Sequence, residues 1–226
     1  LAALTASAAL GLALFIAYGK RAFPSNVSRV SARLVGLGYA LPGTVVAIGV
    51  LVPFAWFDNR LSEFMVANFN YNTGLLLSGT VFILVFAYLV RFLPIALNTV
   101  DAGLTKIRPS MDEAGRSMGL SPAALLRRVH IPIMRGSLAT ALLLVFVDVL
   151  KELPATLLLR PFNFNTLAIR TFELANEERL ADAAGPALAI VLASLIPVIL
   201  LSRTLRHAGE ASSSLPQASV PSDENQ

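Results

Sequence analysis

The sequence predicts an all-α integral membrane protein with five transmembrane helices. Two observations support this. First, 55% of the 226 residues are hydrophobic and only 14% are charged, against roughly 25% charged residues in an average soluble domain. Second, five apolar segments approach the about 20 residues that a helix needs to cross a bilayer. Helices are expected because backbone polar groups inside lipid must be paired within the protein.

The five segments follow one another with polar connections between them. We expect the second to be kinked or shortened by Pro42 and Pro53, and the third to end near Arg91 and Pro94. Many Gly, Ala, Ser and Thr residues within the segments favour close helix packing. The predicted spans are Leu1–Tyr18, Leu34–Phe57, Gly74–Leu97, Gly136–Leu159 and Ala184–Ser202.

The distribution of basic residues predicts the orientation of these spans. Twelve Lys and Arg residues fall in the first and third connections and in the tail, and four fall in the other two connections. The positive-inside rule then places the N-terminus outside, the C-terminus inside and the loop 98–135 in the cytoplasm. The basic residues do not cluster with aromatic ones, which argues against nucleic-acid binding.

The domain organisation is simple. Residues 1–205 are expected to form one transmembrane domain that includes the loop 98–135. Residues 206–226 are rich in Ser, Pro, Gln and Asp and are expected to be a disordered cytoplasmic tail. No stretch of 20–50 residues repeats, and the chain opens directly on an apolar segment, so we expect it to be part of a longer protein.

Local signals divide the cytoplasmic loop into two short helices. Ser110 is a candidate N-cap, with Glu113 three residues later completing a capping box. Gly119 is placed to end this first helix in a left-handed conformation. Ser121-Pro122 then begins a second helix, and Pro132 is expected to end it.

The first of these helices presents a small, flexible apolar face. By the 3.6-residue period, Met111, Ala114, Gly115 and Met118 share that face, with Asp112 at its flank. Methionine side chains adapt to different surfaces, so the face suits a groove on another protein. The sequence therefore predicts a docking helix in this loop.

One motif in the loop resembles a known family. The pattern is Glu113-Ala114-Gly115, three residues, Gly119, nine residues, and Val129 to Pro132. It is similar to the EAA loop of binding-protein-dependent ABC importer permeases, which reads Glu-Ala-Ala, three, Gly, nine, Ile-x-Leu-Pro. The resemblance implies a type I importer permease bundle in the bacterial inner membrane, with this loop docking on the ATPase. The alternative is that Glu113 only caps its helix.

The resemblance implies roles for particular residues and partners. We expect a cytoplasmic ABC ATPase dimer, a second permease half or subunit, a periplasmic substrate-binding protein and membrane lipid as partners. The chain has no Gly-x4-Gly-Lys-Ser/Thr phosphate loop, so we expect the partner subunit to hydrolyse ATP. We expect this chain to bind no cofactor and no metal. The residues expected to couple to the ATPase are Met111, Glu113, Ala114, Gly115, Met118, Gly119, Ile131 and Pro132.

Further stretches are similar to iron(III) importer permeases. They are residues 38–44, 148–164 and 188–191, and the similarity is to the C-terminal half of such permeases. This implies iron(III) as cargo, in a chain that is either half of a fused permease or a free-standing half. The same type of importer for thiamine, a phosphonate, sulfate or a polyamine is an open alternative.

Charged residues inside the fourth predicted span suggest a second site. Asp148, Lys151 and Glu152 are expected on one helical face toward its outer end, with Pro154 bending the helix beside them. A charge facing lipid costs a few kcal/mol, about 3 at mid-membrane, so these side chains should face protein or water. They are expected either to line the translocation path or to form an internal ion pair, and both readings stay open.

An intramembrane enzyme is the alternative from another class. It would need a His-Glu-x-x-His helix, paired intramembrane aspartates or a Ser with a nearby base, and the sequence offers none of these in a convincing arrangement. His130 and His207 are expected to be solvated surface residues. A surface helix is expected within residues 160–182.

Overall fold

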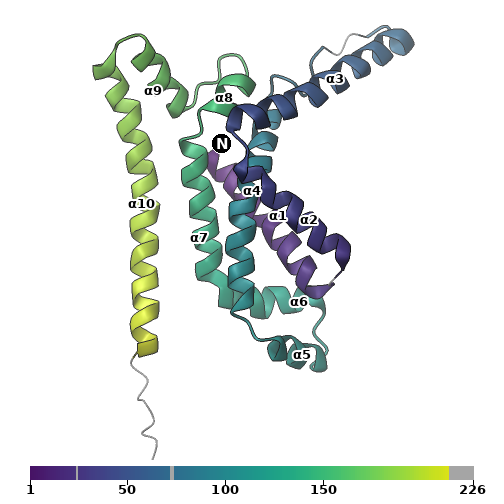
Figure 1. Ribbon diagram of the computed structural model, residues 1–226, viewed down its shortest axis with the longest axis vertical. Coiled ribbons are helices and arrows are strands. Elements are labelled where there is room, and N and C mark those ends of the chain that lie inside the picture. Colours follow the sequence, from purple (N-terminus) through teal and green to yellow (C-terminus); the bar gives the residue numbers. More distant parts are fainter. Residues whose placement is uncertain (24, 72–73, 214–226) are drawn as a thin grey trace, which may run out of the picture.

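A computed structural model describes residues 1–23, 25–71 and 74–213. These residues form helices joined by short turns and contain no strand. Among them, five helices are long and apolar enough to cross a membrane, which confirms the all-α membrane class. Most of the long helices run roughly side by side, apart from α3 (Gly43–Phe69), which projects away from the others, and short helices lie at the two ends (Figure 1).

The centre of the bundle consists of α1 (Ala2–Ala22), α4 (Val81–Thr105) and α7 (Ile131–Leu150). α1 turns a stripe of small side chains toward the other two helices, which lets the backbones approach closely. α1 also runs past the predicted end at Tyr18, because the basic side chains of its last turn favour a helix C-terminus. The buried residues of α1 are Ala2, Thr5, Ala6, Ala9, Ala13 and Ala17.

The second predicted span begins later than expected. Residues 34–40 belong to α2 (Asn26–Gly36) and to a 3-10 turn, η1 (Leu37–Ala40), and the span itself is α3 (Gly43–Phe69). Pro42 separates the two, with an extended ψ of 143° that no α-helix accommodates. Pro53, in contrast, lies inside α3 without ending it.

The third predicted span is shifted along the chain. It runs from Val81 to Thr105, so Arg91 and Pro94 lie in its interior and not at its end. The later start has a physical cause in α3, where Asp58 is buried and accepts hydrogen bonds from the backbone N–H groups of Leu77 and Ser78. These bonds hold the segment before α4 as a loop.

The fourth predicted span ends earlier than expected. α7 stops at Leu150, and a short helix, α8 (Pro154–Leu159), follows after a turn. Proline lacks an N–H and its ring clashes with the carbonyl four residues before it, so Pro154 begins a new helix and does not merely bend the old one. The prediction that Asp148, Lys151 and Glu152 share one helical face is therefore wrong.

The chain closes with α9 (Leu167–Asn176) and α10 (Leu180–Ser213). α9 is the helix expected within residues 160–182. α10 contains the fifth span and stands beside α7 (Figure 1). Most of its apolar side chains that the structure describes are exposed. The helix continues through residues 206–213 of the expected tail, where Ala, Arg and Glu favour helix. Residues 214–226 lie outside the described part.

Candidate functional site

The loop with the motif forms an elbow between α4 and α7. We use "elbow" for residues 109–130, which comprise α5 (Pro109–Ser117), α6 (Pro122–Leu125) and a π-helical turn, η2 (Leu126–His130). The turn leads directly into α7, so α6 and α7 form one continuous span from Pro122 to Leu150. The prediction that Pro132 ends this helix is wrong. Ile131 bonds back to Leu126 in the wider π-turn, so the missing N–H of Pro132 breaks no regular ladder.

α5 begins two residues before the predicted position, since the expected N-cap was Ser110. Pro109 occupies its first turn, Arg108 is its N-cap residue, and no side chain caps this end. Proline is pre-organised for the first helical position, which explains the earlier start. The predicted capping box of Ser110 and Glu113 is therefore wrong, and the Glu113 side chain is exposed.

The end of α5 agrees with the prediction. Gly119 has a φ of +79°, in the left-handed region. Its N–H donates to the carbonyl of Arg116 at 2.9 Å, and the N–H of Leu120 donates to that of Gly115 at 3.0 Å. This is the Schellman arrangement. Ser121 caps α6 as predicted, because its Oγ accepts from the Ala124 N–H.

The two sides of α5 differ in burial. Met111, Ala114 and Met118 are exposed as predicted, with 74% of Met118 accessible. Gly115, which was expected on the same face, instead points inward. A Cβ at this position would lie 2.5 Å from Cδ1 of Leu125, so glycine allows α5 to pack against α6.

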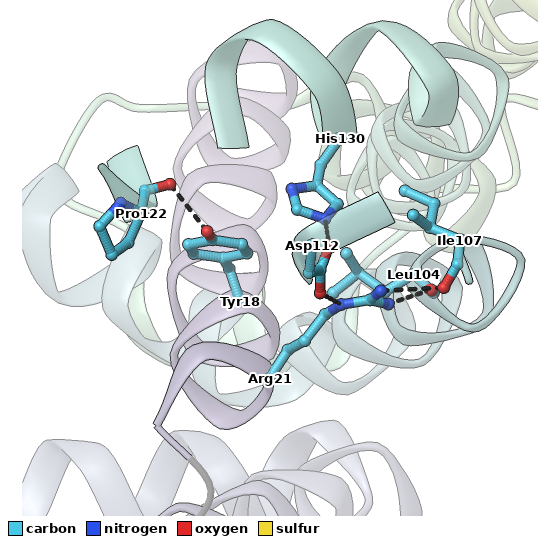
Figure 2. Close-up of polar contacts among 7 residues, drawn as sticks. All are labelled: Tyr18, Arg21, Leu104, Ile107, Asp112, Pro122 and His130. Carbon is cyan, nitrogen blue, oxygen red and sulfur yellow. Dashed lines mark hydrogen bonds and ion pairs between the residues drawn. The ribbon is translucent and has the colours of Figure 1, made fainter. Parts of the chain in front are cut away.

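Asp112 is the polar centre on the inner side of α5 (Figure 2). Its Oδ2 accepts a hydrogen bond from Nε of Arg21, and its Oδ1 lies at the same distance of 2.8 Å from Nε2 of His130. Burial opposes ionisation of the carboxyl, but the hydrogen bonds and charges of Arg21 and His130 outweigh it. The pKa of Asp112 is therefore below its ordinary value.

The same arginine closes the end of α4. Arg21 donates from Nη1 to the carbonyl of Leu104 at 2.5 Å and from Nη2 to that of Ile107 at 2.8 Å. The last carbonyls of a helix have no partner within it, so a cation here both bonds them and favours the helix dipole. One guanidinium thus joins α1, α4 and α5 (Figure 2).

Two aromatic contacts complete the attachment of the elbow to α1. Tyr18 donates its hydroxyl hydrogen to the carbonyl of Pro122 at 2.7 Å, and its ring lies 5.3 Å from that of His130. His130 is fully buried, so the expectation of a solvated histidine is wrong. The side chain of His207 lies outside the part that the structure describes. We call Tyr18, Arg21, Asp112 and His130 the clamp.

The motif predicts the outer face of the elbow as a site but does not predict the clamp. Two charged residues of the clamp are visible in the sequence, because Asp112 directly precedes the motif glutamate and Arg21 lies near the end of an apolar segment. Their spacing in the sequence does not show that they are in contact.

The second predicted site is only partly assembled. Lys151 pairs with Asp148 at 2.8 Å and is well exposed, whereas Glu152 is buried and pairs with Arg91 of α4. Pro154 begins α8 beside them. Among the described residues, no group of three or more His, Cys, Asp or Glu side chains is arranged to hold a metal ion.

Comparison with known proteins identifies the family to which this chain belongs. Residues 9–209 match a family described as binding-protein-dependent transport system inner membrane component. The chain is 32% identical over 171 residues to an Fe(3+)-transport system permease protein, FbpB 2, of Haemophilus influenzae, covering 76% of this chain and 31% of the relative. It is 26% identical to a putative 2-aminoethylphosphonate transport system permease protein, PhnV, of Salmonella typhimurium, covering 76% of this chain and 58% of the relative.

Solved structures share the fold. A bacterial alginate ABC transporter, crystallised with an alginate pentasaccharide-bound periplasmic protein, has a chain that superposes with a TM-score of 0.68 at 15% identity. The match covers 92% of this chain and 77% of that one. The present chain thus spans about a third to somewhat over half the length of the two transport relatives named above.

Proposed function

The chain belongs to the family of binding-protein-dependent transport system inner membrane components, and we propose that it forms one permease half of an ATP-driven importer. In this proposal a periplasmic binding protein delivers the substrate to the outer side of the bundle. A second permease half pairs with this one, and a cytoplasmic ATPase dimer supplies the energy. The N-terminus of the chain lies outside and the elbow lies in the cytoplasm.

The observation that carries the proposal is the two-sided construction of the elbow. The outer side of α5 exposes Met111, Ala114 and Met118, as a surface that docks on another protein would. The inner side is fixed to the bundle through Asp112. A movement imposed on the outer side is therefore passed to the bundle and is not lost in a flexible loop.

The clamp determines which helices receive that movement. Arg21 links Asp112 to the ends of α1 and α4, while the continuous helix from Pro122 to Leu150 carries the elbow directly into α7. α1, α4 and α7 are the same three helices that form the centre of the bundle. ATP-driven closure of the ATPase is thereby coupled to all three.

For the cargo we propose iron(III), with a phosphonate as the second candidate. The relative with 32% identity is named for Fe(3+) transport, and that with 26% identity for 2-aminoethylphosphonate transport. Thiamine, sulfate or a polyamine would require the same machine with a different binding protein. Resident metal ligands are not needed, because a tightly held ion would stall transport.

Reconstituted uptake tests both levels of the proposal. The full-length permease, its ATPase and its binding protein are placed in proteoliposomes, and uptake of labelled iron(III) and of labelled 2-aminoethylphosphonate is measured with and without ATP. ATP-dependent uptake of iron(III) alone is expected. Uptake of the phosphonate alone would correct the cargo and keep the importer, and uptake without ATP would contradict the importer itself.

A further inference from the structure

Two irregular stretches of backbone meet a proline-containing turn of α4 at one place in the bundle. They are residues 37–42, which contain η1 and the turn after it, and residues 151–153 between α7 and α8, and the turn of α4 contains Arg91 and Pro94. At membrane depth, irregular backbone is tolerated only where it is buried in protein or lines a water-filled cavity. Their meeting therefore marks a specialised part of the bundle.

The first contact joins η1 to α4. Pro94 has no N–H, so the carbonyl of Val90, four residues earlier, loses its partner in the helix. Gly38 lies directly against this carbonyl oxygen, and a Cβ there would clash with it. Only glycine allows η1 to approach α4 this closely.

The second contact joins the start of α3 to the turn after α7. A Cβ at Gly43 would lie 2.5 Å from Oε1 of Glu152, 2.9 Å from Nη1 of Arg91 and 3.3 Å from Cβ of Pro154. Gly43 is buried. The first turn of α3 is thus fitted around the two charged side chains.

An ion pair lies between these breaks. Nε of Arg91 is 3.4 Å from Oε2 of Glu152, with 19% and 7% of the two side chains exposed. Arg91 also donates from Nη1 to the carbonyl of Leu41 at 3.0 Å. Oε1 of Glu152 accepts from the N–H of Ala155 at 3.2 Å. The pair therefore connects α4 to residue 41 before α3 and to the first turn of α8.

Stability alone is a weak reason for this arrangement. A buried ion pair is often no more stabilising than apolar side chains of similar size, because both charges lose their hydration. Breaking such a pair by removing one partner is costly. A pair of this kind suits an element with two discrete arrangements, closed with the pair formed and open with both charges solvated.

We propose that Arg91 and Glu152 form a latch that holds the turn 151–153 against the start of α3, and that the latch opens when substrate passes. This inference rests on the proposed transport function. Glu152 is the gating group, and Arg91 and Gly43 are positioning residues that act through it. The neighbouring Asp148–Lys151 pair is not part of the latch, because Lys151 is 64% exposed and its partner is only three residues away in the chain, so the pair does not reach α3 or α4.

A labelling experiment on the full-length transporter tests the latch without requiring transport. This chain contains no cysteine, so Ala155→Cys introduces one thiol next to Glu152 in it; any cysteines in the remainder of the transporter are replaced. Ala155 is fully buried. In membrane vesicles without ATP, we expect a charged methanethiosulfonate reagent to label it slowly. Arg91→Gln should speed labelling about tenfold or more, since loss of one partner shifts the closed–open balance.

Two controls make the result specific. Ala141→Cys, which is also fully buried but lies within α7, should stay protected in every background. Lys151→Gln should leave the labelling of Ala155→Cys within about twofold, since the exposed pair contributes little. Fast labelling of both cysteines in Arg91→Gln would indicate general unfolding and would overturn the proposal.

The double variant Arg91→Gln/Glu152→Gln separates a latch from a purely structural pair. It leaves no unpaired buried charge, so the chain is expected to insert normally. A latch predicts that Ala155→Cys is still labelled rapidly and that the assembled transporter hydrolyses ATP without binding protein. A structural pair predicts protection and wild-type hydrolysis, and that result would overturn the proposal.

The test also distinguishes failure of the latch from failure of the proposed function. A cysteine at Met118 reports contact between the elbow and the ATPase independently of Ala155. Rapid labelling at Ala155 with an intact Met118 contact supports the latch. Slow labelling at Ala155 while Met118 still contacts the ATPase refutes the latch alone. If Met118 does not contact the ATPase in a chain with the natural Arg91 and Glu152, the proposed function is refuted instead.

Discussion

Nε of Arg21 lies 2.8 Å from the carboxylate of Asp112, although 91 residues separate them in the sequence. This bond attaches the elbow to the last turn of α1. Both side chains are largely shielded from solvent, with 18% and 10% exposed. A pair in such a setting is more sensitive to loss of one partner than a surface ion pair.

Loss of the Arg21 side-chain charge should uncouple transport. Arg21→Gln leaves Asp112 with one partner fewer and removes the side-chain donor from the carbonyls of Leu104 and Ile107 at the end of α4, so the docked elbow should lose about 3 kcal/mol. We expect ATP-dependent uptake to fall more than tenfold while the chain still inserts. Lys20→Gln is the matched control, because its pair with Asp101 is more exposed and should matter less than about twofold. Equal effects of the two changes would contradict the clamp.

Charge reversal at Glu113 should act on docking and not on folding. Glu113 is exposed and does not cap α5, so Glu113→Lys should change stability by less than about 0.5 kcal/mol. Uptake is nevertheless expected to be abolished, because the side chain lies on the proposed docking surface. Thermal stability in detergent and uptake in vesicles are the two measurements. Normal uptake would remove Glu113 from the coupling surface.

Gly119 is expected to tolerate no side chain because of its backbone conformation. A Cβ there would have nothing within 4 Å, so the cost of Gly119→Ala is the left-handed φ alone, about 1 kcal/mol. Gly119→Val should cost more and abolish uptake in an inserted chain. Gly11→Ala provides the control, because Gly11 also has open space around it but lies inside α1 without a positive φ. Uptake by Gly119→Val equal to that of the control would contradict the coupling role of this turn.

At Gly115 the lack of space beside Leu125, and not the backbone conformation, should make a side chain unfavourable. The added methyl of Gly115→Ala would press on Leu125, at a cost of about 1–2 kcal/mol for overpacking. Leu125→Val in the same chain removes a methylene and should restore part of the loss. The readout is the rate at which a protease cuts the elbow. Failure of the second change to slow cleavage would show that α5 and α6 do not pack as described.

The clamp should persist at moderately acidic pH. The folded-state pKa of Asp112 is below the unfolded value of about 3.9. Its contribution is therefore fully present above pH about 3.9 and is lost as the pH falls through the lower folded pKa. A spin label at Met118 should show an unchanged docked elbow between pH 8 and pH 5. Release of the elbow within that range, absent in Asp112→Asn, would contradict an ionised, clamped Asp112.

The sequence was informative at two turns of the elbow where local chemistry decides the structure. The left-handed glycine at 119 and the Ser121-Pro122 helix start are local features, and both predictions are confirmed. The predicted start of the third span failed because a distant side chain intervenes. Asp58 bonds to the backbone at residues 77 and 78 and so delays the start of α4, and no hydropathy window contains that information.

The clamp and the latch were missed for the same reason. Arg21 with Asp112, and Arg91 with Glu152, are each joined by tertiary packing over more than 50 residues of sequence. A buried charge predicts that a partner exists but does not say which one. Glu152 was singled out as a charge that should face protein or water, but the sequence did not identify its partner, which is Arg91 on α4.

The most direct test of the account is a crosslink from the outer face of the elbow. Met118→Cys is introduced into the full-length transporter, made otherwise cysteine-free, in native membranes with its ATPase, and Leu158→Cys on α8 at the opposite end of the bundle serves as control. We predict that a short bifunctional reagent joins Met118→Cys to the ATPase subunit, that ATP changes the yield, and that Leu158→Cys gives no such product. Absence of the product from Met118→Cys, or labelling of that cysteine from the periplasmic side, would contradict the account.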